Sequence, residues 1–120
     1  MIKQEFKAKL VRIYLNEGDK RHGTPLYEAI VAKCMELGIA GATVYRGSEG
    51  FGLSAQIHHS SLWPFSQDAP VMVTIIDREE HITRLLPQLD EMLVEALIAI
   101  SDVEVVSYAR NSAANKSTKK

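Results

Sequence analysis

The stretch VMVTIIDREEHITRLLPQL, residues 71–89, decides the fold because it sets a buried strand directly before an amphipathic helix. Residues 71–76 are mostly β-branched, which is typical of a strand covered on both faces. From Ile82 onward, apolar residues recur every three or four positions, which predicts a helix packed along one side. Asp77 and the glutamates near it predict the cap and first turn of this helix, and Pro87 predicts a bend or interruption.

An earlier strand and helix repeat this pairing toward the N-terminus. Residues 7–15, KAKLVRIYL, are largely apolar on both faces, which predicts a second central strand. Thr24 followed by Pro25 predicts a helix start, with Thr24 as the N-cap and Pro25 in the first helical position. Apolar residues at helical spacing continue as far as Leu37, and Gly38 predicts the helix end.

Two further strands complete the pattern. Residues 42–45 predict one of them and residues 103–108, VEVVSY, the last, while residues 97–100 fit either a helix or a strand. The order β-α-β-loop-β-α-β is the ferredoxin-like pattern, an α/β (α+β) sandwich with an antiparallel four-stranded sheet and both helices on one face. We expect residues 1–110 to form this single domain and residues 111–120 to be a disordered basic tail.

The face of the sheet without helices poses a problem of solvation. The two apolar strands present hydrophobic side chains on both of their faces, whereas the helices cover only one. A chain that exposed the second face would leave an apolar patch in water. We therefore expect copies of the chain to associate through this face.

Composition and charge exclude several classes of protein. The 120 residues fit one domain, and 46% hydrophobic with 24% charged residues is ordinary for a globular fold. The formal net charge is −1, so no general basic field attracts nucleic acid. Cys34 is the single cysteine, which excludes an internal disulfide, and its place on the apolar helix face predicts a core residue. The N-terminal residues match neither a signal peptide nor a membrane span, and we expect a cytoplasmic protein without direct membrane insertion.

The glycine-rich stretch after the predicted strand at 42–45 is the main candidate for a binding site. Residues 46–52, RGSEGFG, could form a backbone nest for an anion, with Arg46 pairing to a phosphate. The alternative is a flexible hairpin with a surface arginine. No Gly-Lys-Ser/Thr sequence follows, so this is not a Walker loop. Residues 53–69 are polar and irregular, and a connection of that length is usually functional or disordered.

His58 and His59 raise the question of a metal site. Neighbouring residues of a strand point to opposite faces, so these two side chains could not easily bind one ion. His58 as a polar contact to a ligand is the more specific alternative, and an ordinary histidine is the plain one. No Ser-His-Asp, Cys-His or paired-carboxylate arrangement stands out, and we expect no enzyme activity.

Several segments resemble a known family. The strand leading into residues 46–52 looks like the strand before the large mobile T-loop of PII signal-transduction proteins. The resemblance is closer to an uncharacterised PII-like branch, known as a domain of unknown function, and it covers about residues 8–109. The segments that carry it are IYLNE (13–17), GTPLYE (23–28), AGATVYRGSEGFG (40–52), IH (57–58), APV (69–71) and LPQLD (86–90).

This resemblance implies a homotrimer with its sheets packed around a three-fold axis. It also implies small-molecule sites between the subunits, with adenine nucleotides as the expected ligands. We expect no cofactor. A T-loop that responds to the ligand would engage or release a partner protein, such as a membrane transporter or channel. PII proteins hold phosphates with a glycine- and lysine-containing loop after their second helix, but residues 95–102, EALIAISD, contain neither residue type.

The leading hypothesis is therefore a trimeric sensor of the PII-like kind. Its adenine nucleotide would lie against residues 41–44 and 46–52 and would order residues 53–69. The rivals are a metal-binding trimer similar to the copper-tolerance proteins of the same fold, and a weak enzyme. The expected ligand contacts are Gly41, Thr43, Arg46, Gly47, Glu49, Gly50, Gly52, His58 and Arg110.

Overall fold

The computed structural model describes residues 1–51, 58–59 and 69–110. Its main elements follow the predicted order of strand, helix, strand, strand, helix, strand. These are β1 (Ile2–Asn16), α1 (Leu26–Glu36), β4 (Gly41–Arg46), β7 (Pro70–Asp77), α2 (Glu79–Met92) and β8 (Leu97–Ala109). Four two-residue strands lie in the connections: β2 (Lys20–Arg21), β3 (Thr24–Pro25), β5 (Glu49–Gly50) and β6 (His58–His59).

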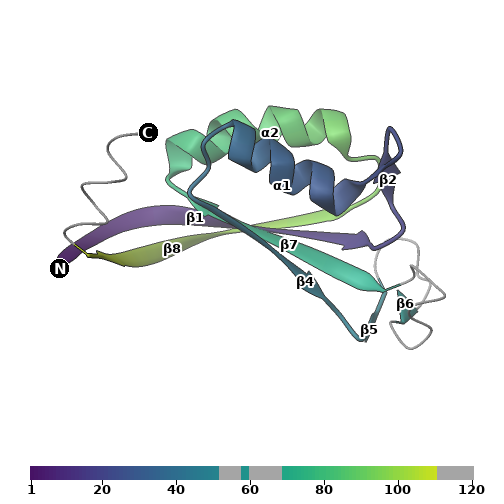
Figure 1. Cartoon of the computed structure of the whole chain (residues 1–120), viewed down its shortest axis with the longest axis horizontal. Helices are drawn as coiled ribbons and strands as arrows, with labels where there is room; N and C mark the ends of the chain where they lie inside the picture. The colour runs from purple at the N-terminus through teal and green to yellow at the C-terminus, as the bar shows by residue number, and fades with distance from the viewer. Residues whose placement is uncertain (52–57, 60–68, 111–120) are drawn as a thin grey trace.

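The sheet is antiparallel and has the strand order β4-β7-β1-β8. The two strands whose sequences are apolar on both faces, β1 and β7, are the central pair, as predicted. Both helices lie on one face of the sheet (Figure 1), so the predicted ferredoxin-like fold class is confirmed. The pairing of β8 with β1 begins at Leu97 opposite Tyr14, which assigns residues 97–100 to a strand.

The core lies between the helices and the sheet. Alternate residues of the central strands point toward the helices, while each helix contributes one apolar stripe. The buried residues of this cluster are Val11, Ile13, Leu15, Val71, Val73 and Ile75 from the sheet, with Leu26, Ile30, Cys34, Ile82, Leu85, Leu89 and Met92 from the helices. Cys34 is 2% exposed, so its assignment to the core is confirmed.

Of the two ends of α1, the C-terminal end agrees with the prediction and the N-cap does not. Gly38 has φ of 73°, and the amides of Gly38 and Ile39 donate to the carbonyls of Met35 and Cys34, as in a Schellman ending. The predicted N-cap was wrong, because Thr24 belongs to the short strand β3 and Pro25 occupies the N-cap position.

The start of α2 also differs from the prediction. Arg78 is its N-cap, and Asp77 is instead the last residue of β7. Asp77 is only 5% exposed, and its carboxylate accepts hydrogen bonds from the amides of Ala40 (2.9 Å) and Arg78 (2.7 Å). It therefore joins β7 to the turn before β4. The helix continues across Pro87, so Pro87 does not interrupt it.

The helix-free face of the sheet carries three rows of side chains. Residues paired across neighbouring strands point to the same face, and each row crosses β8, β1, β7 and β4 in that order. We call this surface the open face. Its rows are Leu97–Tyr14–Met72–Tyr45, Ala99–Arg12–Thr74–Thr43 and Ser101–Leu10–Ile76–Gly41.

Candidate functional site

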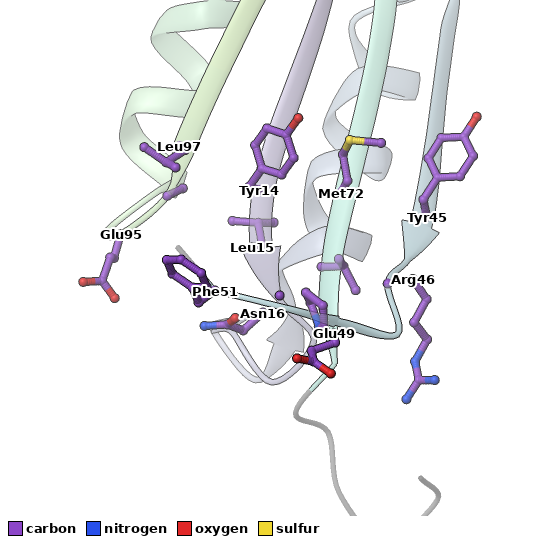
Figure 2. Close-up of a pocket in the computed structure, with 15 residues that line it drawn as sticks. Tyr14, Leu15, Asn16, Tyr45, Arg46, Glu49, Phe51, Met72, Glu95 and Leu97 are labelled. Carbon is purple, nitrogen blue, oxygen red and sulfur yellow. The ribbon is translucent and has the colours of Figure 1, made fainter. Parts of the chain in front are cut away.

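A pocket of about 390 Å³ opens at the end of the open face where β1 and β4 finish. Its volume is within the range of small-molecule sites. Residues from all four strands of the sheet and from the segment after β4 meet there (Figure 2). The lining residues are Tyr14, Leu15, Asn16, Tyr45, Arg46, Gly47, Glu49, Gly50, Phe51, Pro70, Val71, Met72, Glu95, Ala96 and Leu97.

One wall of the pocket is the first row of the open face. Met72 lies between Tyr14 and Tyr45 in the sheet register, and Figure 2 shows the three side chains standing side by side on the same face. Tyr14 and Tyr45 are 43% and 53% exposed, and Phe51, on the segment after β4, is 73% exposed. Large exposed aromatic surfaces of this kind bind flat rings by stacking.

Arg46 ends β4 at the rim of the pocket and is held by Glu17. Its Nε and Nη2 donate to the two carboxylate oxygens of Glu17 at 3.1 and 2.9 Å. The Glu17 side chain is only 13% exposed, so this bidentate pair is partly removed from water. The hydrogen bond to Glu17 raises the pKa of Arg46 above its usual value.

The segment that begins at Gly47 is anchored to the end of β7. The Gly47 amide donates to the Pro70 carbonyl at 2.7 Å, and the Glu17 amide donates to the Ala69 carbonyl at 2.8 Å. A Cβ on Gly47 would come within 3.0 Å of Pro70 Cγ, which explains glycine at this position by close approach. Within the described residues, glycines with positive φ are Gly23 and Gly38, so Gly47 and Gly50 do not adopt the alternating conformation of an anion nest.

The structure brings together only part of the predicted site. Arg46, Gly47, Glu49 and Gly50 line the pocket. Of the other predicted contacts, Thr43 lies in the second row of the open face and Gly41 in the third, nearer its other end, and Gly52 is outside the described residues.

The remaining two predicted contacts lie elsewhere. His58 pairs with Gly50 in the β5–β6 ladder, but its side chain is outside the described part of the structure. Arg110 follows β8 at the end where Ala109 pairs with Ile2. That end is about 40 Å along the strand from Tyr14, at about 3.3 Å per residue.

Sequence reasoning missed the aromatic side chains of the pocket and two carboxylates in it or beside it. The missed lining residues are Tyr14, Tyr45, Phe51 and Glu95. Glu17, which accepts hydrogen bonds from Arg46, was also missed. The available signal was the even-numbered face of residues 7–15, where Tyr14 is a large side chain on the face that no helix covers. The described residues contain no group of three or more His, Cys, Asp or Glu placed to hold a metal ion.

Comparison with known proteins agrees with this architecture. Residues 8–105 match the model of the family described as DUF190, Uncharacterized ACR. The chain belongs to the DUF190 family. A UPF0166 protein of Methanocaldococcus jannaschii is 40% identical to this DUF190 protein over 100 residues, which cover 82% of this chain and 92% of the relative.

Solved structures with the same fold include PII-like proteins. CPII of Thiomonas intermedia K12, a nitrogen regulatory PII-like protein bound to ADP, AMP and bicarbonate, aligns with a TM-score of 0.62 and 20% identity. That alignment covers 85% of the DUF190 chain and 91% of CPII. The divalent ion tolerance protein CutA1 of Ehrlichia chaffeensis aligns at a TM-score of 0.54 and 10% identity, over 88% and 86% of the two chains. These identities establish the shared fold alone.

None of the helices in the described part of the chain is both long enough and apolar enough to span a bilayer.

Proposed function

We propose that this DUF190 protein is a PII-like regulatory protein that binds an adenine nucleotide in the pocket at the end of the open face. The observation that carries the proposal is the pocket itself, with exposed tyrosines on one wall and the segment after β4 on another. CPII, which has the same fold, is bound to ADP and AMP. The proposed role is binding rather than catalysis.

The adenine ring is proposed to stack on the row that contains Tyr14, Met72 and Tyr45. Stacking of a base on an aromatic side chain contributes about 1–3 kcal/mol. The segment from Gly47 to Phe51 borders the same pocket, so a bound ligand contacts the beginning of the long connection to β7. In the proposed mechanism, binding shifts the population of conformations of this connection, and a partner protein such as a transporter or channel recognises the change.

We further propose that three copies associate through the open face. Leu10 and Ile76 are half-buried apolar residues of its third row, away from the pocket. Association would cover these side chains. It would also place the pocket near a neighbouring subunit.

Calorimetry with AMP, ADP, ATP and cyclic AMP tests the nucleotide part of the proposal. We expect saturable heats with wild-type protein and weaker binding by Arg46→Ala, in which the rim of the pocket is altered. The matched control is Arg84→Ala, an exposed arginine on α2 that does not line the pocket. Absence of heat with all four nucleotides, for protein that is folded by circular dichroism, would rule the nucleotide out. Divalent metals in the same screen test the CutA1-like rival, with His58→Ala as its diagnostic variant.

Light scattering tests the association. We expect a mass of about 40 kDa, three times the 13.4 kDa chain. Leu10→Lys places a charge on the open face and is expected to yield monomers, because burying an unpaired ammonium is unfavourable. Val94→Lys is the matched control, since Val94 is fully exposed in the turn after α2. A 13.4 kDa mass for the wild type at working concentration contradicts the trimer.

A further inference from the structure

The charges around the pocket are unusual for a site that would hold a polyphosphate. Its charged lining residues among those described are Arg46, Glu49 and Glu95, and Glu49 is already engaged in an interaction of its own. Glu95 is exposed at the start of the turn into β8 and stands at the rim opposite Arg46 (Figure 2). A phosphate chain that enters beside Glu95 approaches its carboxylate, and like charges repel.

Arg46, the cation among the described lining residues, is already hydrogen-bonded to Glu17. Two of the donor nitrogens of Arg46 are directed at Glu17, whose carboxylate is 13% exposed. A phosphate that recruited Arg46 fully would leave Glu17 without its partner in a position from which water is largely excluded, and such a carboxylate is costly. The Arg46–Glu17 pair therefore offers a ligand a few N–H groups but little net positive charge.

The uncharged surface of the pocket also suits a ligand with little phosphate charge. Tyr14, Tyr45 and Phe51 provide aromatic rings, and Asn16 provides an amide at the foot of β1. These groups bind a flat base and its ribose through stacking and neutral hydrogen bonds. None of them carries a positive charge that would attract additional phosphates.

We infer that the pocket selects, among adenine compounds, those with the least phosphate charge, so that adenosine and AMP bind better than ADP and ATP. This inference rests on the proposed function, and it makes Glu17 and Glu95 determinants of specificity. Glu95 acts by repelling the phosphate chain at the rim. Glu17 acts through Arg46, because the hydrogen bonds between them keep the Arg46 guanidinium from pairing with a phosphate.

Calorimetry with adenosine, AMP, ADP and ATP, in EDTA so that the phosphates keep their full charge, tests the inference. We expect ATP to bind about tenfold more weakly than adenosine. Salt gives a second readout, because it screens exposed charges. Repulsion predicts that ATP binds more tightly as NaCl rises from 50 to 500 mM, whereas a phosphate clamp predicts weaker binding.

Two variants identify the residues responsible. Glu95→Gln is expected to reduce the ATP-to-adenosine ratio of Kd values about threefold, and Glu17→Gln to reduce it further by releasing Arg46. Glu5→Gln, an exposed position of β1 remote from the pocket, should leave the ratio unchanged. Glu17 is largely buried, so Glu17→Gln could fail to fold. In that case the ratio of Kd values measured for Glu95→Gln, at an exposed position, is sufficient to test the inference.

The outcomes separate this inference from the proposed function. If ATP binds most tightly and weakens with salt, the selection by charge is wrong while nucleotide binding stands. An unchanged ratio in Glu95→Gln also overturns the role assigned to that carboxylate. If none of the four adenine compounds binds, the proposed function fails and the inference fails with it.

Discussion

Replacing Asp77 with alanine tests whether this carboxylate fastens the edge strand of the site to the body of the protein. Asp77 ends β7, and its two oxygens accept the amides of Ala40, just before β4, and Arg78, just before α2. Its Oδ2 also lies 2.9 Å from Nδ1 of His81. In Asp77→Ala, the Ala40 amide loses the bond that connects the start of β4 to the neighbouring strand.

The expected loss of stability follows from these two backbone bonds. A hydrogen bond to a charged group contributes about 1.5–3 kcal/mol. Ala40 and Arg78 are exposed residues, so water partly replaces the carboxylate and the lower end of the range applies, about 3 kcal/mol for the pair. For a chain of 120 residues the unfolding entropy is about 0.25 kcal/mol/K, so the Tm should fall by about 12 °C. Asp90→Ala, an exposed position on α2, should change stability by less than about 0.5 kcal/mol.

Amide hydrogen exchange distinguishes this role from that of a helix cap. If Asp77 fastens β4, the Ala40 amide loses protection in Asp77→Ala while the amides of the first turn of α2 change little. Selective loss of protection in that first turn would mean that Asp77 acts on α2 as a cap. A Tm within 2 °C of the wild type, measured at the same protein concentration, would refute the assigned magnitude.

Three further outcomes are expected. Gly47→Ala should lower stability by about 1 kcal/mol, because its Cβ would meet Pro70 Cγ at 3.0 Å, whereas Gly50→Ala, at 3.6 Å from Pro70, should be tolerated in thermal melts. Burial raises the pKa of the Cys34 thiol to about 11, so a thiol reagent at pH 8 should label the protein only after denaturation. Burial raises the pKa of Asp77, but the hydrogen bonds from Arg78, Ala40 and His81 outweigh it and lower that pKa. The stabilisation by Asp77 is thus complete above about pH 4, the pKa of an unfolded aspartate, and disappears as the pH falls through the folded pKa, so the Tm difference from Asp77→Ala should narrow in acid.

The order of strands and helices was predictable because hydrophobic period is a local property. The apolar runs of β1 and β7 predicted central strands because both faces of each strand are apolar, and the sheet order confirms the prediction. Gly38 was recognisable because a left-handed residue after a helix favours glycine. The N-cap residues of the two helices were not predictable in this way. Asp77 faces Ala40, 37 residues away in the chain, and nothing in the local sequence reports that contact.

The pocket was predictable on one side only. Glycines beside Arg46 marked the segment after β4, and Arg46, Gly47, Glu49 and Gly50 do line the pocket. The opposite wall depends on register, since Tyr14 and Tyr45 fall in one row only because both are paired with Met72. Sequence patterns give the face of a strand but not the residue that stands beside it.

The carboxylates of Asp77 and Glu17, both largely buried, show how the edge strand β4 is held in place. β4 lies at the edge of the sheet, and an edge strand has fewer backbone partners than a central one. Asp77 binds the amide just before β4, and Glu17 binds Arg46 at its last position. Both carboxylates come from the ends of the central strands, so polar contacts at each end add to the ladder with β7. The strand that leads into the glycine-rich segment is therefore anchored at both ends, and Glu17 holds β4 with the same guanidinium that a phosphate would need.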